Sequence, residues 1–255
     1  MGAMSGKSRK NSEVSLILAA GTILALAAGV AAALAGFGSR IHLWHFRVGF
    51  SILKWAACGG FVATLVSLAG AVIAVKSGCL RGIAYSLFGI IVGGAVFTVP
   101  LHWRMKAISF PPIHDITTDI VQPPQFVSIL KLRKDALNPV AYGGPEVAAR
   151  QRAAYPDIQT FLLYAPKSQA FDQALAAARA MRWRIVVADP QQGRIEATDT
   201  TFWFGFKDDI VVRVTAAGVH RSLVDVRSVS RVGRSDVGTN AKRIRAYLHR
   251  LKAGE

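Results

Sequence analysis

Residues 14–38, VSLILAAGTILALAAGVAAALAGFG, contain no charged side chain. At about 1.5 Å per residue, a helix of this length exceeds the roughly 30 Å of a bilayer hydrocarbon core. Two further runs share this character. Residues 48–75 are interrupted only by Lys54, and residues 82–101 carry no charge. Because helices of water-soluble proteins need a wide polar face, the sequence predicts a membrane region at 14–101 with three spans at about 14–38, 48–75 and 82–101.

The basic residues around these runs predict the orientation. A basic N-terminal tail, residues 1–13, precedes the first run, which is too long for the apolar part of a cleaved signal peptide. Basic residues on the tail's side of the spans outnumber those on the other side by five to four, and the first helix usually dominates. We therefore expect a multi-pass protein of the cell inner membrane whose soluble domain is periplasmic. The two sets are Lys7, Arg9, Lys10, Lys76 and Arg81 against Arg40, Arg47, Arg104 and Lys106.

Composition limits the chemistry. The 255 residues include two cysteines, Cys58 and Cys79, both within or beside the apolar runs, so the soluble part has neither a disulfide framework nor a cysteine nucleophile. His42 and His45 are spaced for a metal or haem on a helix, but no third ligand lies nearby, and with Trp44 they fit an interfacial aromatic belt better. We predict no cofactor and no metal.

Small residues recur in the apolar runs, and Gly89 with Gly93 forms a GxxxG pair. Such pairs let helices approach closely in lipid, either within one chain or between two copies. The absence of acidic residues from the spans argues against a proton-coupled transporter, so we interpret this region as an anchor.

The soluble part divides near residue 156. Seven of the ten prolines fall between Pro111 and Pro156, so we expect residues 102–156 to form a Pro-rich extended linker. Residues 157–255 then alternate between strand and helix periodicity in the order β-α-β-β-β-β-α. Short turns make the sheet antiparallel, and two amphipathic helices cover only one of its faces. The fold class is therefore an α-helical membrane anchor of three spans followed by an α+β soluble domain. The expected elements are strands at 158–164, 183–188, 194–200, 208–215 and 223–230, and helices at 166–181 and 237–251.

Four stretches resemble one bacterial family, the domain of unknown function 1499 (DUF1499), over roughly residues 110–252. The most specific is Asp225-Val-Arg-Ser-Val-Ser-Arg-Val-Gly-Arg-Ser-Asp-Val-Gly238, continued by Asn240 and Arg243-Ile-Arg245. The resemblance implies an apolar N-terminus and no known enzymatic activity. The other three are Ile113-His-Asp-Ile-Thr-Thr-Asp119, Tyr155-Pro-Asp-Ile158 and Gly205-Phe-Lys-Asp-Asp-Ile210.

The same stretch holds the candidate site. Gly233 and Gly238 allow unusual backbone conformations, Ser235 or Asp236 is placed to cap the last helix, and a helix N-terminus attracts anions. The alternative is structural, with the arginines paired to Asp208, Asp209 or Asp225. The candidate anion-binding residues are Arg227, Ser230, Arg231, Arg234, Ser235, Asn240 and Arg243.

Net charge is +16, and residues 227–252 hold eight Lys/Arg against one acid. Such a surface favours a binding module whose partners are the lipid bilayer and an anionic lipid, an envelope polymer or a protein. The alternative is a membrane-tethered hydrolase that uses Asp208 or Asp209, Arg227 or Arg231, and His114. Asp208 and Asp209 are adjacent on a strand, so their side chains face opposite ways, and this geometry is poor for a paired acid/base dyad. Nucleic-acid binding is not expected, because Glu196 and Asp225 on the sheet would repel phosphate.

Overall fold

The computed structural model describes the backbone of residues 3–253 and the side chains of residues 19–253. The chain forms two compact units. The first comprises Met1–Lys106 together with Phe202–Gly205, and the second comprises Ala107–Thr201 with Phe206–Glu255. The expected basic tail, residues 1–13, lies outside the residues whose side chains are described.

Three apolar helices build the first unit: α1 (Ala3–Arg40), α2 (Phe46–Lys76) and α3 (Leu80–Ser109). The stretches long and apolar enough to cross a membrane are Ala19–Arg40, Phe46–Lys76 and Leu80–Ser109. The expectation of three apolar helices is confirmed. The third continues past residue 101 to Ser109 although Pro100 lies inside it. Membrane helices tolerate such a proline when neighbouring groups satisfy the freed carbonyl.

The GxxxG pair of α3 packs against α2. A Cβ atom added to Gly89 would lie 2.2 Å from Ser67 Oγ, and one added to Gly93 would lie 2.7 Å from the Gly60 carbonyl oxygen. In lipid, where burial gives helices no drive to associate, such close backbone approach supplies the packing. These two glycines therefore serve packing within the unit.

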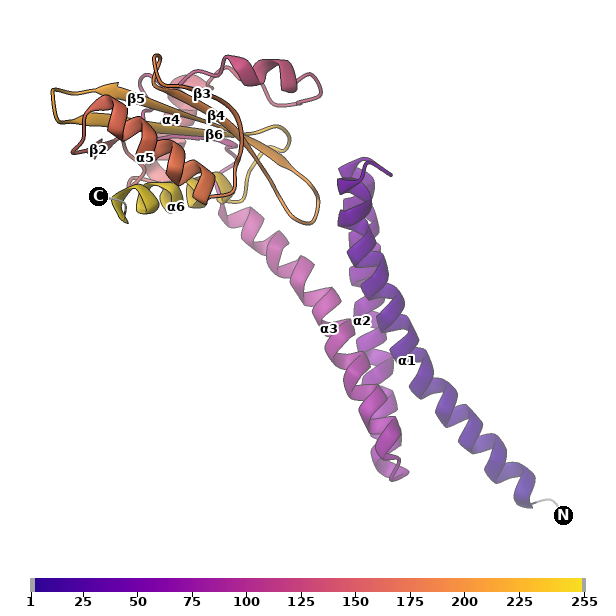
Figure 1. The fold of residues 1–255 in the computed structure, drawn as a ribbon. Coiled ribbons are helices and arrows are strands. Elements are labelled where there is room, and N and C mark those ends of the chain that lie inside the picture. Colours follow the sequence, from indigo (N-terminus) through magenta and orange to yellow (C-terminus); the bar gives the residue numbers. More distant parts are fainter. Residues whose placement is uncertain (1–2, 254–255) are drawn as a thin grey trace. The chain divides into compact units, whose positions relative to one another are not determined.

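An antiparallel sheet organises the second unit, which confirms the predicted fold class (Figure 1). Its strand order is β1-β6-β5-β4-β3, and β2 also pairs with β6. From residue 157 onward the elements follow the predicted order, although β2 is shorter than expected. The strands are β1 (Asp115–Thr117), β2 (Phe161–Leu163), β3 (Arg184–Asp189), β4 (Arg194–Thr200), β5 (Lys207–Ala216) and β6 (Ser222–Ser230).

Two helices, α5 (Lys167–Ala180) and α6 (Thr239–Ala253), cover one face of this sheet (Figure 1). We call it the helix face. Apolar side chains that alternate along β4, β5 and β6 pack there against both helices, as the two-residue period predicts. Trp183 stacks on Tyr247 of α6 with ring centroids 5.0 Å apart. This is the main hydrophobic core.

Most of the segment expected to be a linker, residues 102–156, takes part in the second unit, which begins at Ala107. It contains the end of α3, strand β1, a 3₁₀ helix η1 (Ser128–Leu132) and helix α4 (Gly144–Ala154). Strand β1 pairs with β6 over three residues. A Pro-rich chain can do this because it stays extended and can lie at a sheet edge.

Residues 118–143, which we call the covering segment, lie over the second face of the sheet. Phe126 and Ile129 of this segment pack on Val211 of β5 and Val229 of β6. Apart from this small apolar cluster, the second face is built from charged and hydroxyl side chains, and these provide the site.

Candidate functional site

The predicted anion-binding residues lie on different sides of the sheet. Arg227 and Arg231 take part in contacts of the second face, beneath the covering segment. Ser230, Asn240 and Arg243 interact with one another on the helix face. The structure therefore brings these five residues together as two groups separated by the sheet.

Arg227 is enclosed completely. Its side chain is fully buried, and its guanidinium donates to both carboxylate oxygens of Asp115 at 2.9 and 2.7 Å. It also donates to the carbonyl of Pro124 at 3.2 Å and to that of Val140 at 2.6 Å. The Phe126 ring centroid lies 5.3 Å from its Cζ. These contacts attach both ends of the covering segment to the middle of β6.

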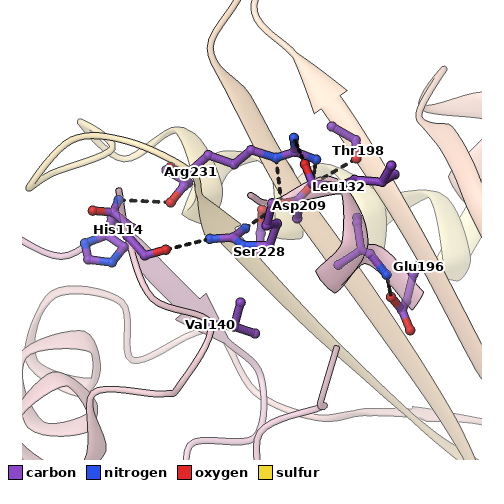
Figure 2. A network of polar contacts seen from close by, with 12 residues as sticks. His114, Leu132, Val140, Glu196, Thr198, Asp209, Ser228 and Arg231 are labelled. Carbon is purple, nitrogen blue, oxygen red and sulfur yellow. Dashed lines mark hydrogen bonds and ion pairs between the residues drawn. The ribbon is translucent and has the colours of Figure 1, made fainter. Parts of the chain in front are cut away.

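Asp209 forms the second fixed point of this face. Arg231 donates to both its oxygens at 2.9 and 2.8 Å, and Thr198 Oγ1 donates at 2.9 Å (Figure 2). Arg133 of the covering segment also donates to Asp209, and Arg231 donates to the Leu132 carbonyl at 2.6 Å. The carboxylate, which is fully buried, thus holds two arginines.

Glu196 of β4 organises η1. This fully buried carboxylate accepts hydrogen bonds from the backbone N–H groups of Val127, Ser128 and Ile129 at 3.0, 3.1 and 2.8 Å. The first N–H groups of a helix have no partner within the helix, so an acceptor at this position stabilises its start. Arg194 lies 3.0 Å from the same carboxylate.

These contacts belong to a larger set of ion pairs on the second face, which we call the polar layer. The positive and negative charges of this layer are equal in number. Its five arginines carry +5 and its five carboxylates carry −5, so the net charge is zero. Buried guanidinium groups that are already paired have no spare charge for an anionic ligand. The members are Arg133, Arg194, Arg213, Arg227 and Arg231, with Asp115, Asp119, Glu196, Asp209 and Asp225.

On the helix face, Arg243 is the centre of a second cluster. It donates to Asp208 at 2.6 Å, to Asp199 at 2.9 Å and to Ser228 Oγ at 3.1 Å. Asn240 accepts from Arg243 and Ser228, and it donates to Ser230 Oγ at 3.0 Å. This cluster ties the start of α6 to three neighbouring strands.

Asp208 and Asp209 face opposite ways, as the strand pattern predicts. Asp208 pairs with Arg243 on the helix face, whereas Asp209 pairs with Arg231 on the second face. The side chains therefore do not meet, and each is neutralised by a different arginine. The His114 carbonyl accepts from the backbone of Ser230, and burial lowers the pKa of the His114 imidazole.

The N-terminus of α6 is capped by the protein's own carboxylate. Asp236 accepts from the backbone N–H groups of Gly238 at 3.0 Å and Asn240 at 2.6 Å, and burial raises its pKa. Ser235 Oγ donates to the Pro111 carbonyl at 3.1 Å. Gly238 has a φ of +75°, so this glycine supplies the backbone conformation that was expected of it.

Other basic side chains remain on the surface. Arg234 is exposed, and among the described residues it forms no ion pair within 4.0 Å. A larger group lies on the exposed side of α6, where residues 242, 245, 249 and 252 follow the three- and four-residue spacing of one helix face and Arg250 lies at its edge. We call it the α6 basic face. It consists of the exposed residues Lys242, Arg245, His249, Arg250 and Lys252.

Within the α6 basic face, only Arg245 forms an ion pair with a described residue, Asp157. Lys242, Arg250 and Lys252 keep their charge available to solvent. The prediction from sequence counted these residues within the basic C-terminal end but did not separate them from the buried arginines. The spacing 242, 245, 249 and 252 is the signal that marks them as one face.

Residues 115–251 match the family model described as protein of unknown function DUF1499. This range covers the sheet, the covering segment and nearly all of α6. The comparison with curated proteins found no match.

Proposed function

Since this chain belongs to the DUF1499 family, whose function is unknown, we propose a role from its own geometry: a membrane-anchored domain that binds the phosphates of anionic lipid headgroups through the α6 basic face. One observation carries the proposal. Arg227 of β6 and Arg231 just after it are consumed by internal pairing, whereas Lys242, Arg250 and Lys252 are exposed without an ion pair among the described residues.

The charge on this face is suited to a surface rather than to a small ligand. Exposed cations spread along a helix attract a layer of anions over distances near the Debye length, about 8 Å at physiological salt. Close to an anionic leaflet each Lys or Arg contributes about 1 kcal/mol. Three such residues therefore supply about 3 kcal/mol of binding free energy.

The apolar helices favour lipid as the partner. Three helices of this length and hydropathy indicate membrane insertion. A domain on the same chain stays within a short distance of headgroups, and this raises their effective concentration. An anionic envelope polymer and a protein partner are then outcomes that the test must distinguish.

We also propose that the protein lies in the cell inner membrane with its soluble domain in the periplasm. The support is the distribution of basic residues around the spans. A C-terminal fusion to a reporter enzyme that is active only outside the cytoplasm should be active. An inactive fusion, with a cytoplasmic reporter active instead, would reverse the orientation.

Binding is tested with the full chain held in nanodiscs of neutral phosphatidylcholine. These are mixed with vesicles of phosphatidylcholine alone, or with phosphatidylglycerol added, and recruitment is measured by flotation. We expect binding to the anionic vesicles at about 0.1 M salt and its loss at about 1 M, where the Debye length falls to about 3 Å. Empty nanodiscs control for disc–vesicle contact.

Two triple variants of equal charge change locate the binding face. Lys242→Ala, Arg250→Ala and Lys252→Ala together should weaken binding on the order of 100-fold, from about 3 kcal/mol lost. The control replaces the exposed residues Lys131, Arg179 and Arg221 with Ala.

The control variant should retain most of the binding. Equal loss in both triples would mean that net charge alone drives binding, and equal binding to neutral vesicles would reject the anionic ligand.

A further inference from the structure

An aromatic loop belongs to the first unit although its neighbours in sequence belong to the second. This loop, Phe202–Gly205, is called the aromatic tip. Trp203 Nε1 donates to the Ala33 carbonyl of α1 at 3.1 Å, and Arg40 donates to the Phe202 carbonyl at 2.7 Å. The Phe204 ring lies 4.9 Å from that of Phe50 of α2. The tip therefore packs along the sides of two candidate spans.

The contacts reach below the end of the first span. Ala19–Arg40 has 22 residues, about 33 Å of helix, which just covers a hydrocarbon core of roughly 30 Å. Ala33 precedes Arg40 by seven residues, which is about 10 Å along the helix axis. The indole N–H of Trp203 thus pairs with α1 at the depth of the outer hydrocarbon, where water is scarce.

Two polar groups of the tip have the protein partners that such an environment requires. Irregular backbone at membrane depth is tolerated only where its N–H and C=O groups find protein partners. The Phe202 carbonyl and the Trp203 indole have the partners just described. At the base of the tip, Thr201 N donates to the Phe206 carbonyl at 2.8 Å, and Phe206 N donates to Thr201 Oγ1 at 2.9 Å.

One side chain of the tip is directed outward. Phe202 is 77% exposed, and its ring lies 5.6 Å from that of Phe37. The packing of the tip against α1 depends on Gly36, where an added Cβ would lie 2.2 Å from the Trp203 ring. The result is an apolar projection beside an arginine, Arg40, which is the composition of a membrane interface.

We propose that the aromatic tip inserts into the membrane interface and that its partner is the boundary between lipid headgroups and acyl chains. The Phe202 ring enters lipid while Trp203 and Phe204 lock the tip to α1 and α2. This attachment needs no anionic lipid, so it goes beyond the proposed binding by α6 and does not depend on it.

The test measures depth in the full chain. Cys58 and Cys79 are replaced with Ala, and Phe202→Cys carries a fluorescent NBD group in nanodiscs of neutral phosphatidylcholine. A nitroxide on carbon 5 of the acyl chain should quench this label several-fold more than a label at Val219→Cys. Val219 is a matched control because it is also highly exposed, at 80%, in the turn between β5 and β6.

Two glycine variants test whether the packing of the tip against α1 sets the depth of position 202. Gly36→Ala should reduce quenching at position 202, whereas Gly29→Ala should not, because a Cβ there would be in ordinary contact with Val92 at 3.7 Å and Val96 at 3.8 Å. Equal quenching of both labels by the lipid nitroxide, or no effect of Gly36→Ala, would overturn the proposal. Because the discs hold only neutral lipid, neither result bears on the α6 basic face.

Discussion

The substitution Arg227→Ala tests whether the arginine-rich stretch is structural. Arg227 is fully buried and Asp115 is 5% exposed, and they form a two-bond pair at 2.9 and 2.7 Å. The matched control is Arg245→Ala. Its pair with Asp157 has the same geometry, at 2.6 and 2.7 Å, but the two side chains are 45% and 53% exposed.

Burial sets the expected difference. Removing one partner of a buried ion pair costs about 3–5 kcal/mol, because the other charge is left unpaired in a poor solvent. An exposed pair contributes about 0–1 kcal/mol. Arg227→Ala should therefore raise the opening equilibrium of the sheet by on the order of 10²- to 10⁴-fold, and Arg245→Ala by less than about tenfold.

Hydrogen exchange measured by mass spectrometry on the full chain in nanodiscs reports this equilibrium from β5 amides. A second variant, Asp115→Leu with Arg227→Met, removes both charges and should recover most of the lost protection. If Arg227→Ala leaves β5 exchange unchanged, or if the double variant is worse than the single one, the reasoning about the polar layer is wrong.

Three further outcomes follow from single contacts. Gly93→Ala should lower the melting temperature in detergent because its Cβ would meet the Gly60 carbonyl at 2.7 Å, whereas Gly94→Ala, which meets nothing within 4 Å, should not. Burial raises the pKa of Tyr155 to about 12, so ionisation favours unfolding above pH 10 and stability falls as the pH rises from 10 toward 12. Tyr155→Phe should flatten that fall in urea titrations, and an unchanged slope would contradict it. Glu196→Leu should speed exchange at the three N–H groups of residues 127–129 by on the order of tenfold or more, since each loses its acceptor; slow exchange there would show that the carboxylate does not hold η1.

Much of the fold follows from local periodicity. The two-residue pattern placed Ile195 and Ala197 on the core side and Glu196 with Thr198 on the other, and the structure has them so. The same pattern predicted that Asp208 would face away from its neighbour. These features depend on neighbouring residues, and the sequence displays them directly.

The covering segment could not be predicted in this way. It has no helical or strand period, and what attaches it to the sheet are contacts between residues far apart in the chain. Arg133 and Asp209, for example, are separated by 76 positions, and no local signal pairs them. Proline density was therefore interpreted as a linker, although the segment forms one layer of the domain.

The candidate site shows the same limit. Arginine content identified a basic region, but only burial distinguishes Arg227 and Arg243, which are paired inside, from Lys242 and Arg250, which are exposed. A count of charges cannot make this distinction. The helical spacing within α6 is the one sequence signal that could have separated them, and the prediction did not use it.

Photo-crosslinking in native membranes tests most directly whether α6 contacts lipid. The full chain carries benzoylphenylalanine at Lys242 or, as the control, at Arg179, which is also exposed. The account predicts phospholipid adducts from position 242 and few from position 179. Adducts only with a protein or polymer at position 242, or equal lipid adducts at both positions, would contradict it.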